Sequence, residues 1–141
     1  MLLVTKIFHF EMAHAIHGYD GPCKHIHGHS YVLEVTVTSE SDNNTYLDKT
    51  GFVVDFKDLK RIVTDAIIKK YDHKLVLSKE YMSAHPNFTA AENLIIWDFE
   101  PSAENIILYF KNTLNTILPE EMQLARLKLY ETSSSFAEWI R

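Results

Sequence analysis

The sequence lacks several features on which whole classes of proteins depend. Its 141 residues include one cysteine, Cys23, so the chain cannot form an internal disulfide, which is typical of a reducing compartment. Four glycines and four prolines are too few for a collagen-like or low-complexity chain. Apolar runs such as 94–97 are far shorter than the ~20 residues that span a bilayer, and the N-terminus carries no secretion signal. We therefore expect a cytoplasmic protein with no membrane partner.

Basic side chains are also few. Lysine and arginine number 14 against 19 aspartates and glutamates, which gives a net charge of −5 with neutral histidines. Nucleic acids and anionic membranes attract proteins with excess positive charge, so neither is expected as the main partner. The length and the 46% hydrophobic content suit one domain, over residues 1–141, with one core.

Period-two alternation of apolar residues predicts the strands. It runs through residues 4–14, 27–37 and 122–131, and the last residues, 135–141, can supply a short edge strand. In the first strand His14 shares the side of Phe8, Phe10 and Met12, so we expect its imidazole to face the core.

Helical spacing of apolar residues predicts two helices. One covers 56–71, after Asp55 as N-cap, and the other begins after Ser102 as N-cap and ends before Pro119. Residues 74–100 fit neither pattern and are left unassigned. Runs of strands and helices predict an α+β fold, with a four-stranded antiparallel sheet and two helices on one face. The other face would need a partner, so we expect a homo-oligomer.

Histidines are the most informative residues, because six of the eight lie between His9 and His29. His27 and His29 are two apart in a strand and project to the same face, and His14 ends the neighbouring strand. Zinc accepts neutral imidazole nitrogens, and three protein ligands leave a fourth position open, as in catalytic zinc sites. The alternative is that these histidines are solvated or satisfied in the core.

Cys23 lies four residues before His27 in a polar loop, which allows three interpretations. It can be a small buried apolar residue, or a thiolate activated by nearby cationic groups. It can also be a fourth metal ligand, which would close the site and make it structural.

Two further groups of residues carry chemistry. Asp72 next to His73 can orient an imidazole for general base catalysis, although a cation at a helix C-terminus explains the pair equally well. Glu131 lies on the apolar side of its strand, where a carboxylate is costly unless it is paired. It is neutralised by a basic side chain or accepts adjacent N–H donors of a ligand, as a pterin or guanine ring offers.

Together these motifs resemble the 6-pyruvoyltetrahydropterin synthase family. The matching segments, in the order of the family, are Phe10–His14, Cys23 with His27-Gly28-His29, Gly51–Phe56, Asp72–Lys74, Pro101–Asn105 and Glu131-Thr132. The three-residue gap between Cys23 and His27 is similar to the 6-carboxytetrahydropterin synthase branch, whose enzymes act in queuosine biosynthesis.

The resemblance implies the tunnelling fold, in which subunits join their sheets into a barrel as trimers or hexamers. It implies zinc on His14, His27 and His29. It also implies Cys23 as proton acceptor and His73 with Asp72 as a relay. Glu131 would anchor the pterin and take part in the relay, and Ser102 and Thr132 would contact the substrate.

The reaction implied is zinc-dependent conversion of 7,8-dihydroneopterin triphosphate to 6-carboxy-5,6,7,8-tetrahydropterin, with release of acetaldehyde and triphosphate. The alternatives are a 6-pyruvoyltetrahydropterin synthase, which eliminates only triphosphate, and a non-catalytic pterin-binding oligomer stabilised by zinc. Two features depart from the family pattern: Ala15 and Ile16 stand where a basic residue often follows the first zinc histidine, and the segment 75–100 is long.

Overall fold

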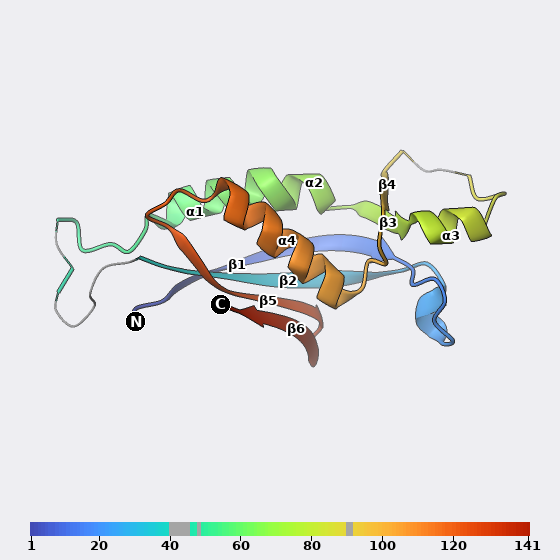
Figure 1. The fold of residues 1–141 in the computed structure, drawn as a ribbon, viewed down its shortest axis with the longest axis horizontal. Helices are drawn as coiled ribbons and strands as arrows, with labels where there is room; N and C mark the ends of the chain where they lie inside the picture. The colour runs from blue at the N-terminus through green and yellow to red at the C-terminus, as the bar shows by residue number, and fades with distance from the viewer. Residues whose placement is uncertain (40–45, 48, 90–91) are drawn as a thin grey trace.

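The computed structural model describes residues 1–39, 46–47, 49–89 and 92–141. One sheet forms the body of the molecule, with strands in the order β4-β3-β1-β2-β5-β6. The strands are β1 Val4–His14, β2 His27–Thr38, β3 Lys74–Ser78, β4 Leu94–Trp97, β5 Gln123–Thr132 and β6 Ser135–Ile140. The helices are α1 Phe56–Val63, α2 Lys69–Tyr71, α3 Lys79–Ala84 and α4 Ala103–Ile117, and short helical segments are η1 Pro22–Lys24 and η2 Thr64–Ile68 (Figure 1).

The four predicted strands are confirmed, and they pair antiparallel as β1 with β2, β2 with β5, and β5 with β6. The predicted strand number was wrong, because β3 and β4 come from the unassigned segment and extend the sheet in parallel beside β1. These two strands are short and carry apolar residues without period-two alternation, so their sequence does not distinguish them from buried helix. The fold is α+β with a mixed six-stranded sheet.

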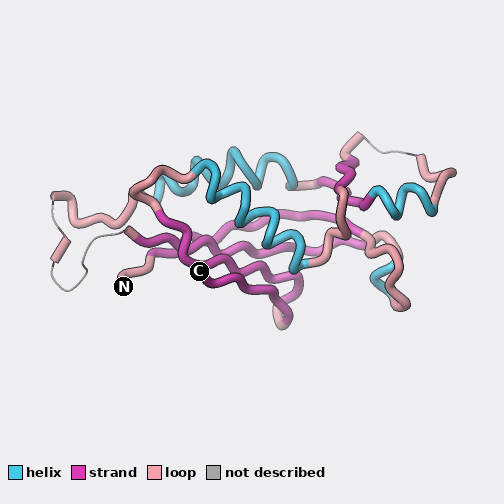
Figure 2. The backbone as a smooth tube through the Cα atoms, viewed as in Figure 1, coloured by secondary structure: helices cyan, strands magenta, loops and turns pink. Residues whose placement is uncertain are grey.

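Both predicted helices are confirmed, and their N-caps act as expected. The Asp55 carboxylate accepts the N–H of Lys57 at 2.8 Å, and the Ser102 hydroxyl accepts that of Asn105 at 3.3 Å. The first helix is continuous from α1 to α2 through the π-helical turn η2. Figures 1 and 2 show α1, α2 and α4 together on one face of the sheet. None of the helices in the described part of the chain is long and apolar enough to cross a membrane.

The main core lies between this helical layer and the sheet. The ring of Phe10 on β1 stacks on that of Tyr31 on β2, with centroids 5.1 Å apart, and meets Phe110 of α4 edge-on at 6.0 Å. Fully buried residues of the same cluster include Leu33, Val35, Leu59, Val63, Ile67, Ile106, Leu114, Leu127 and Leu129. This packing fixes β1, β2 and β5 relative to α4.

A second, smaller core explains one departure from the family pattern. Ala15 is completely buried against Leu75, Leu77 and Tyr81, which belong to β3 and α3. A charged side chain at position 15 would be removed from water here, which costs several kcal/mol without a partner. The segment that follows Lys74 therefore covers the position where a basic residue was expected.

The other face of the sheet carries no helix in the described residues (Figure 1). Ile7, Glu34, Lys128 and Glu138 follow one another across β1, β2, β5 and β6 on this face. Arg126 reaches the carboxylates of Glu34 and Glu138, both at 3.7 Å. The expected asymmetry of the sheet is thus present, with one covered face and one face of mixed charged and apolar side chains.

Candidate metal centre

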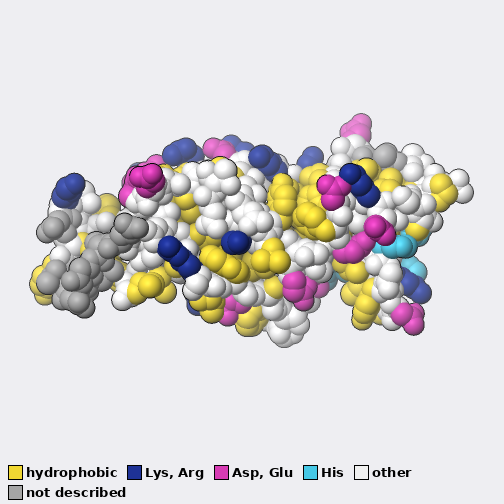
Figure 3. Space-filling model, in the orientation of Figure 1, with side chains coloured by type: hydrophobic (Ala, Val, Ile, Leu, Met, Phe, Trp, Pro, Cys, Tyr) yellow, Lys and Arg dark blue, Asp and Glu magenta, His cyan; other side chains and the backbone are white. Residues whose placement is uncertain are grey.

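The pairing of β1 with β2 brings three histidines together. His14 lies opposite His27 in the register, and His29 projects to the same face two residues further along β2. One ring nitrogen from each of the three lies within 4.8 Å of the other two. In Figure 3 histidine side chains reach the surface at the end of the molecule that carries the β1–β2 connection. The three histidines named from the sequence therefore do converge.

Backbone carbonyls determine the tautomers of two of these rings. His14 Nδ1 donates to the carbonyl oxygen of Pro101 at 2.6 Å, and His27 Nδ1 donates to that of His25 at 2.7 Å, because a carbonyl can only accept. In the neutral rings both Nε2 atoms therefore carry bare lone pairs, and they lie 3.1 Å apart. Two facing lone pairs repel unless a cation or a proton lies between them.

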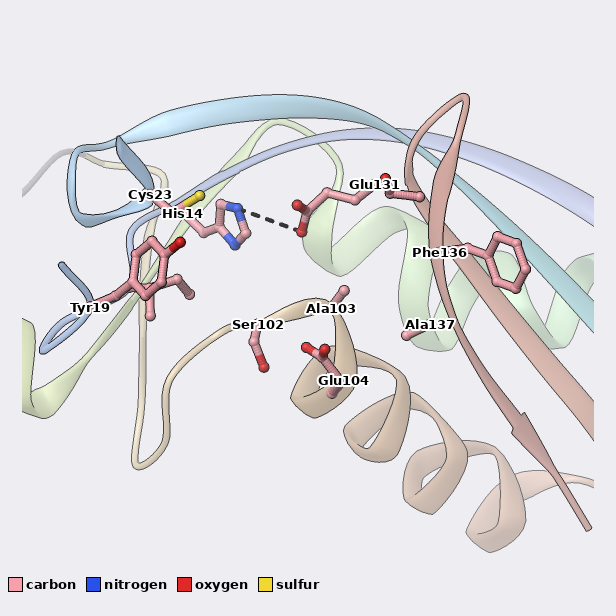
Figure 4. A pocket seen from close by; sticks show the side chains of 11 residues that line it. His14, Tyr19, Cys23, Ser102, Ala103, Glu104, Glu131, Phe136 and Ala137 are labelled. Carbon is pink, nitrogen blue, oxygen red and sulfur yellow. Dashed lines mark ion pairs between the residues drawn. The ribbon is translucent and has the colours of Figure 1, made fainter. Parts of the chain in front are cut away.

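The third ring and a carboxylate complete the arrangement. His29 Nε2 is buried and has no hydrogen-bond partner among the described residues. The Glu131 carboxylate, at the end of β5, lies 3.4 Å from His29 Nε2. It also lies 3.9 Å from His14 Nε2, which is the ion pair drawn in Figure 4. Buried polar groups usually have a partner, so an orphaned imidazole nitrogen beside two lone pairs fits a metal ligand.

Burial favours the neutral form of two of the imidazoles. Desolvation lowers the pKa of His14 and of His29 below the ordinary value of 6.5, although the nearby Glu131 carboxylate acts in the opposite direction. Neutral imidazole is the form that binds a metal. The three-nitrogen donor set, with oriented tautomers, fits a borderline-soft divalent ion such as zinc.

A cavity of about 370 Å³ opens beside the histidines. Cys23 from η1 and Tyr19 line it on one side, Glu131 on another, and Ser102 at the N-terminus of α4 on a third (Figure 4). The other lining residues are His14, Ile16, Ala103, Glu104, Ser135, Phe136 and Ala137. The half-buried Cys23 is not in the group of side chains close enough to share one ion, as far as the described residues show.

Asp72 and His73 lie between α2 and β3 and do not line this cavity. His73 is 77% exposed, its Nδ1 lies 3.0 Å from Asp72 Oδ1, and the same oxygen accepts the N–H of Glu11 at 2.8 Å. His73 has a left-handed φ of 62°, and its own N–H donates to the Glu11 carbonyl at 2.6 Å. The pair is thus held rigidly at β1, but it is not among the described residues that line the Cys23 cavity.

Of the two remaining residues predicted to contact the substrate, one lines the cavity and the other does not. Ser102 lines the cavity, whereas Thr132 does not, and its hydroxyl accepts the N–H of Ser134 at 3.3 Å. Sequence reasoning did not find Tyr19, which lines the cavity beside Cys23, or the role of the Pro101 carbonyl. No periodicity marks Tyr19, and a backbone acceptor has no signature in the side-chain pattern.

Fold and site together define a class: an α+β domain in which three strand histidines can hold one metal beside a thiol and a carboxylate. The model of the family described as 6-pyruvoyl tetrahydropterin synthase matches residues 3–140. The chain belongs to this family, whose members are enzymes that process pterins.

Individual relatives give a finer resemblance. The chain is 34% identical to the 6-carboxy-5,6,7,8-tetrahydropterin synthase of Rickettsia typhi, over 98% of this chain and 99% of that protein. It is 31% identical to the protein of the same name from Haemophilus influenzae, over 99% of both. The structure of Plasmodium falciparum 6-pyruvoyl tetrahydropterin synthase covers 99% of this chain and 97% of its own, with a TM-score of 0.72 at 20% identity. The tunnelling fold is thereby confirmed.

Proposed function

We propose that the protein is a zinc-dependent 6-carboxytetrahydropterin synthase, a lyase that converts 7,8-dihydroneopterin triphosphate and one water molecule to 6-carboxy-5,6,7,8-tetrahydropterin, acetaldehyde and triphosphate. The proposal depends on one observation: three imidazole nitrogens converge, and one of the three residues, His14, lines a cavity together with the Cys23 thiol and the Glu131 carboxylate. The similarity to synthases of that name over nearly the whole chain supports it.

Zinc, held by His14, His27 and His29, would supply a Lewis acid that polarises the hydroxyl groups of the substrate side chain. The Cys23 thiolate lies on the cavity wall and would remove a proton from the side-chain carbon next to the ring. Because an external reductant is not needed for an internal redox step, the absence of a glycine-rich nucleotide motif from the sequence is consistent with this chemistry.

Glu131 would hold the pterin ring. Its carboxylate can accept two adjacent N–H groups of the ring, and its position near His29 and His14 would place the side chain of the substrate at the metal. Ser102, on the opposite wall, would add a hydroxyl contact. Thr132 does not line this cavity, but its hydroxyl accepts the N–H of Ser134 and keeps an O–H that would be able to donate to the substrate.

The Asp72–His73 pair would serve the site of a neighbouring subunit. His73 is exposed and does not line the Cys23 cavity of its own chain, so we expect it to reach the thiol of a neighbouring subunit across an interface. The uncovered face of the sheet supports assembly into a trimer or hexamer, which is typical of the family. We propose a cytoplasmic homo-oligomer whose partner is its small-molecule substrate.

Product analysis tests the proposal. The purified enzyme, loaded with zinc, is incubated with 7,8-dihydroneopterin triphosphate, and acetaldehyde, triphosphate and the pterin product are measured. Acetaldehyde and triphosphate in equal amounts are expected. Triphosphate without acetaldehyde would indicate the 6-pyruvoyl product, and pterin binding without either product would indicate a non-catalytic protein.

A further inference from the structure

Glu100 makes a contact that the proposed reaction does not use. It lies between β4 and α4, and its half-buried carboxylate reaches across to the loop that follows β1. There Oε2 accepts the backbone N–H of His17 at 2.8 Å. The two residues are 83 positions apart in the sequence, so the bond joins two distant segments of the chain.

The segment around Glu100 is fixed at the start of α4 and contacts the metal centre. The carbonyl oxygen of Glu100 accepts the side-chain amide of Asn105 at 2.9 Å and the N–H of Ser102 at 2.9 Å. The next carbonyl, that of Pro101, is the acceptor that orients the ring of His14. Partners that orient a metal-binding imidazole commonly affect metal affinity and activity.

The segment on the other side of the contact carries the thiol. The N–H of Ile16 donates to the carbonyl oxygen of Cys23 at 2.8 Å, which closes the loop between β1 and β2 on itself. His17, next to Ile16, donates to Glu100. Among the described residues, the loop is therefore held near Cys23 by an internal hydrogen bond at Ile16 and by an external one to Glu100.

We propose that Glu100 is a positioning residue: its carboxylate attaches the loop of Cys23 to the segment that orients His14, and so sets the place of the thiol relative to the three histidines. The inference rests on the proposed function for the roles of Cys23 and the histidines. Glu100 itself does not line the cavity among the described residues, so it acts through these neighbours.

Loss of the acceptor has a specific expected effect. In Glu100→Ala the half-buried N–H of His17 loses its partner, and the loop can move as a unit with Cys23. Misplacement of a reacting group by about 1 Å lowers the rate of the chemical step, so kcat should fall about tenfold or more. The Michaelis constant should change little, because Glu131 on β5 holds the pterin. Glu100→Gln keeps an acceptor oxygen and should restore kcat.

The experiment compares Glu100→Ala, Glu100→Gln and the wild type, all loaded with zinc. Asp98→Ala is the matched control, because Asp98 is 75% exposed and pairs with Lys79 on the surface. Since Cys23 is the only cysteine, iodoacetamide reports on its thiol alone. The rate of alkylation without substrate should differ from that of the wild type by at least about threefold in Glu100→Ala, and should stay near wild type in Glu100→Gln and in the control.

Zinc content, thermal unfolding, kcat and the Michaelis constant are measured on the same samples. If Glu100→Ala does not fold, Glu100→Asp replaces it, because its shorter side chain cannot reach His17 without moving the loop. Unchanged alkylation and kcat in these variants, or a Glu100→Gln enzyme as impaired as Glu100→Ala, would overturn the proposal. The alkylation measurement needs no turnover, so it tests Glu100 even if the wild type releases no acetaldehyde.

Discussion

The Nε2 atoms of His14 and His27 lie 3.1 Å apart, and both rings carry their hydrogen on Nδ1, where it is donated to a backbone carbonyl. This arrangement makes the pair electrostatically unfavourable in the neutral state and favourable around a cation. The metal site is thus prepared by the backbone: Pro101 and His25 supply the carbonyls that direct the lone pairs toward each other.

Replacement of Cys23 separates its two chemical roles. If the thiol is a proton acceptor and not a ligand, Cys23→Ala should still bind about one zinc per chain but lose at least about 100-fold in kcat, the usual contribution of a general base. Zinc content by atomic emission and acetaldehyde release measure the two effects. A variant that loses its zinc would instead place the sulfur among the ligands.

Protonation of the buried histidines should destabilise the metal-free protein in acid. The pKa of His14 and of His29 is lowered by burial, so below pH 6.5 the unfolded chain takes up protons that the folded chain does not. The two histidines therefore make their full contribution to the free energy of unfolding above pH 6.5, and this contribution decreases as the pH falls below 6.5. Thermal unfolding of the chelator-treated protein from pH 8 to pH 5 measures this. In His29→Asn the decrease should be smaller, and an equal decrease would contradict the assignment.

Glu131 should matter for substrate binding. Glu131→Gln keeps the size of the side chain but replaces an acceptor oxygen by a donor that faces the N–H groups of the pterin. Loss of one charge-assisted hydrogen bond, about 2 kcal/mol, should raise the Michaelis constant about 30-fold. Glu138→Gln, on the other face of the sheet, is the control and should behave as wild type. Steady-state kinetics measures the Michaelis constant of both variants. Similar Michaelis constants for Glu131→Gln and Glu138→Gln would exclude an anchoring role for Glu131.

Mixed oligomers test whether His73 serves a neighbouring subunit. Cys23→Ala and His73→Ala should each be nearly inactive. When the two are unfolded together and refolded, random assembly puts an intact Cys23 next to an intact partner histidine in roughly a quarter of the sites of a cyclic oligomer. Activity should then return to about that fraction of the wild type. Light scattering checks that the oligomer has reformed. If it has reformed and the mixture stays inactive, both residues must come from one chain.

Ala15 should not tolerate a charge. Because it is completely buried against Leu75, Leu77 and Tyr81, Ala15→Arg should lower the free energy of unfolding by at least about 3 kcal/mol. Ala84→Arg, at the exposed end of α3, is the matched control and should change it by less than about 0.5 kcal/mol. Urea unfolding of both variants gives the comparison. A stable Ala15→Arg protein would mean that the β3–α3 segment can move away from β1.

The strands β1, β2 and β5 could be predicted because each has one covered face, which leaves a period of two in the sequence, whereas β6 was predicted only as a short edge strand at 135–141. Alternation in β1 and β2 also placed His14, His27 and His29 on one side of the sheet. The strands β3 and β4 could not be predicted, since short apolar runs such as Leu94–Trp97 have no period that distinguishes strand from helix. The position of β3 beside β1 explains why residue 15 is a small apolar residue, which the sequence alone showed only as a departure from the family pattern.

The sequence by itself determined the chemical groups of this protein and the faces on which local geometry places them: two imidazoles two residues apart, a third on the next strand, a thiol and a carboxylate. Only the tertiary structure decided which groups meet. The Pro101 carbonyl at His14, the Glu100 carboxylate at His17 and the exclusion of His73 from the cavity of its own chain involve segments far apart in sequence. Such contacts depend on how helices and strands pack, and side-chain periodicity carries no information about that.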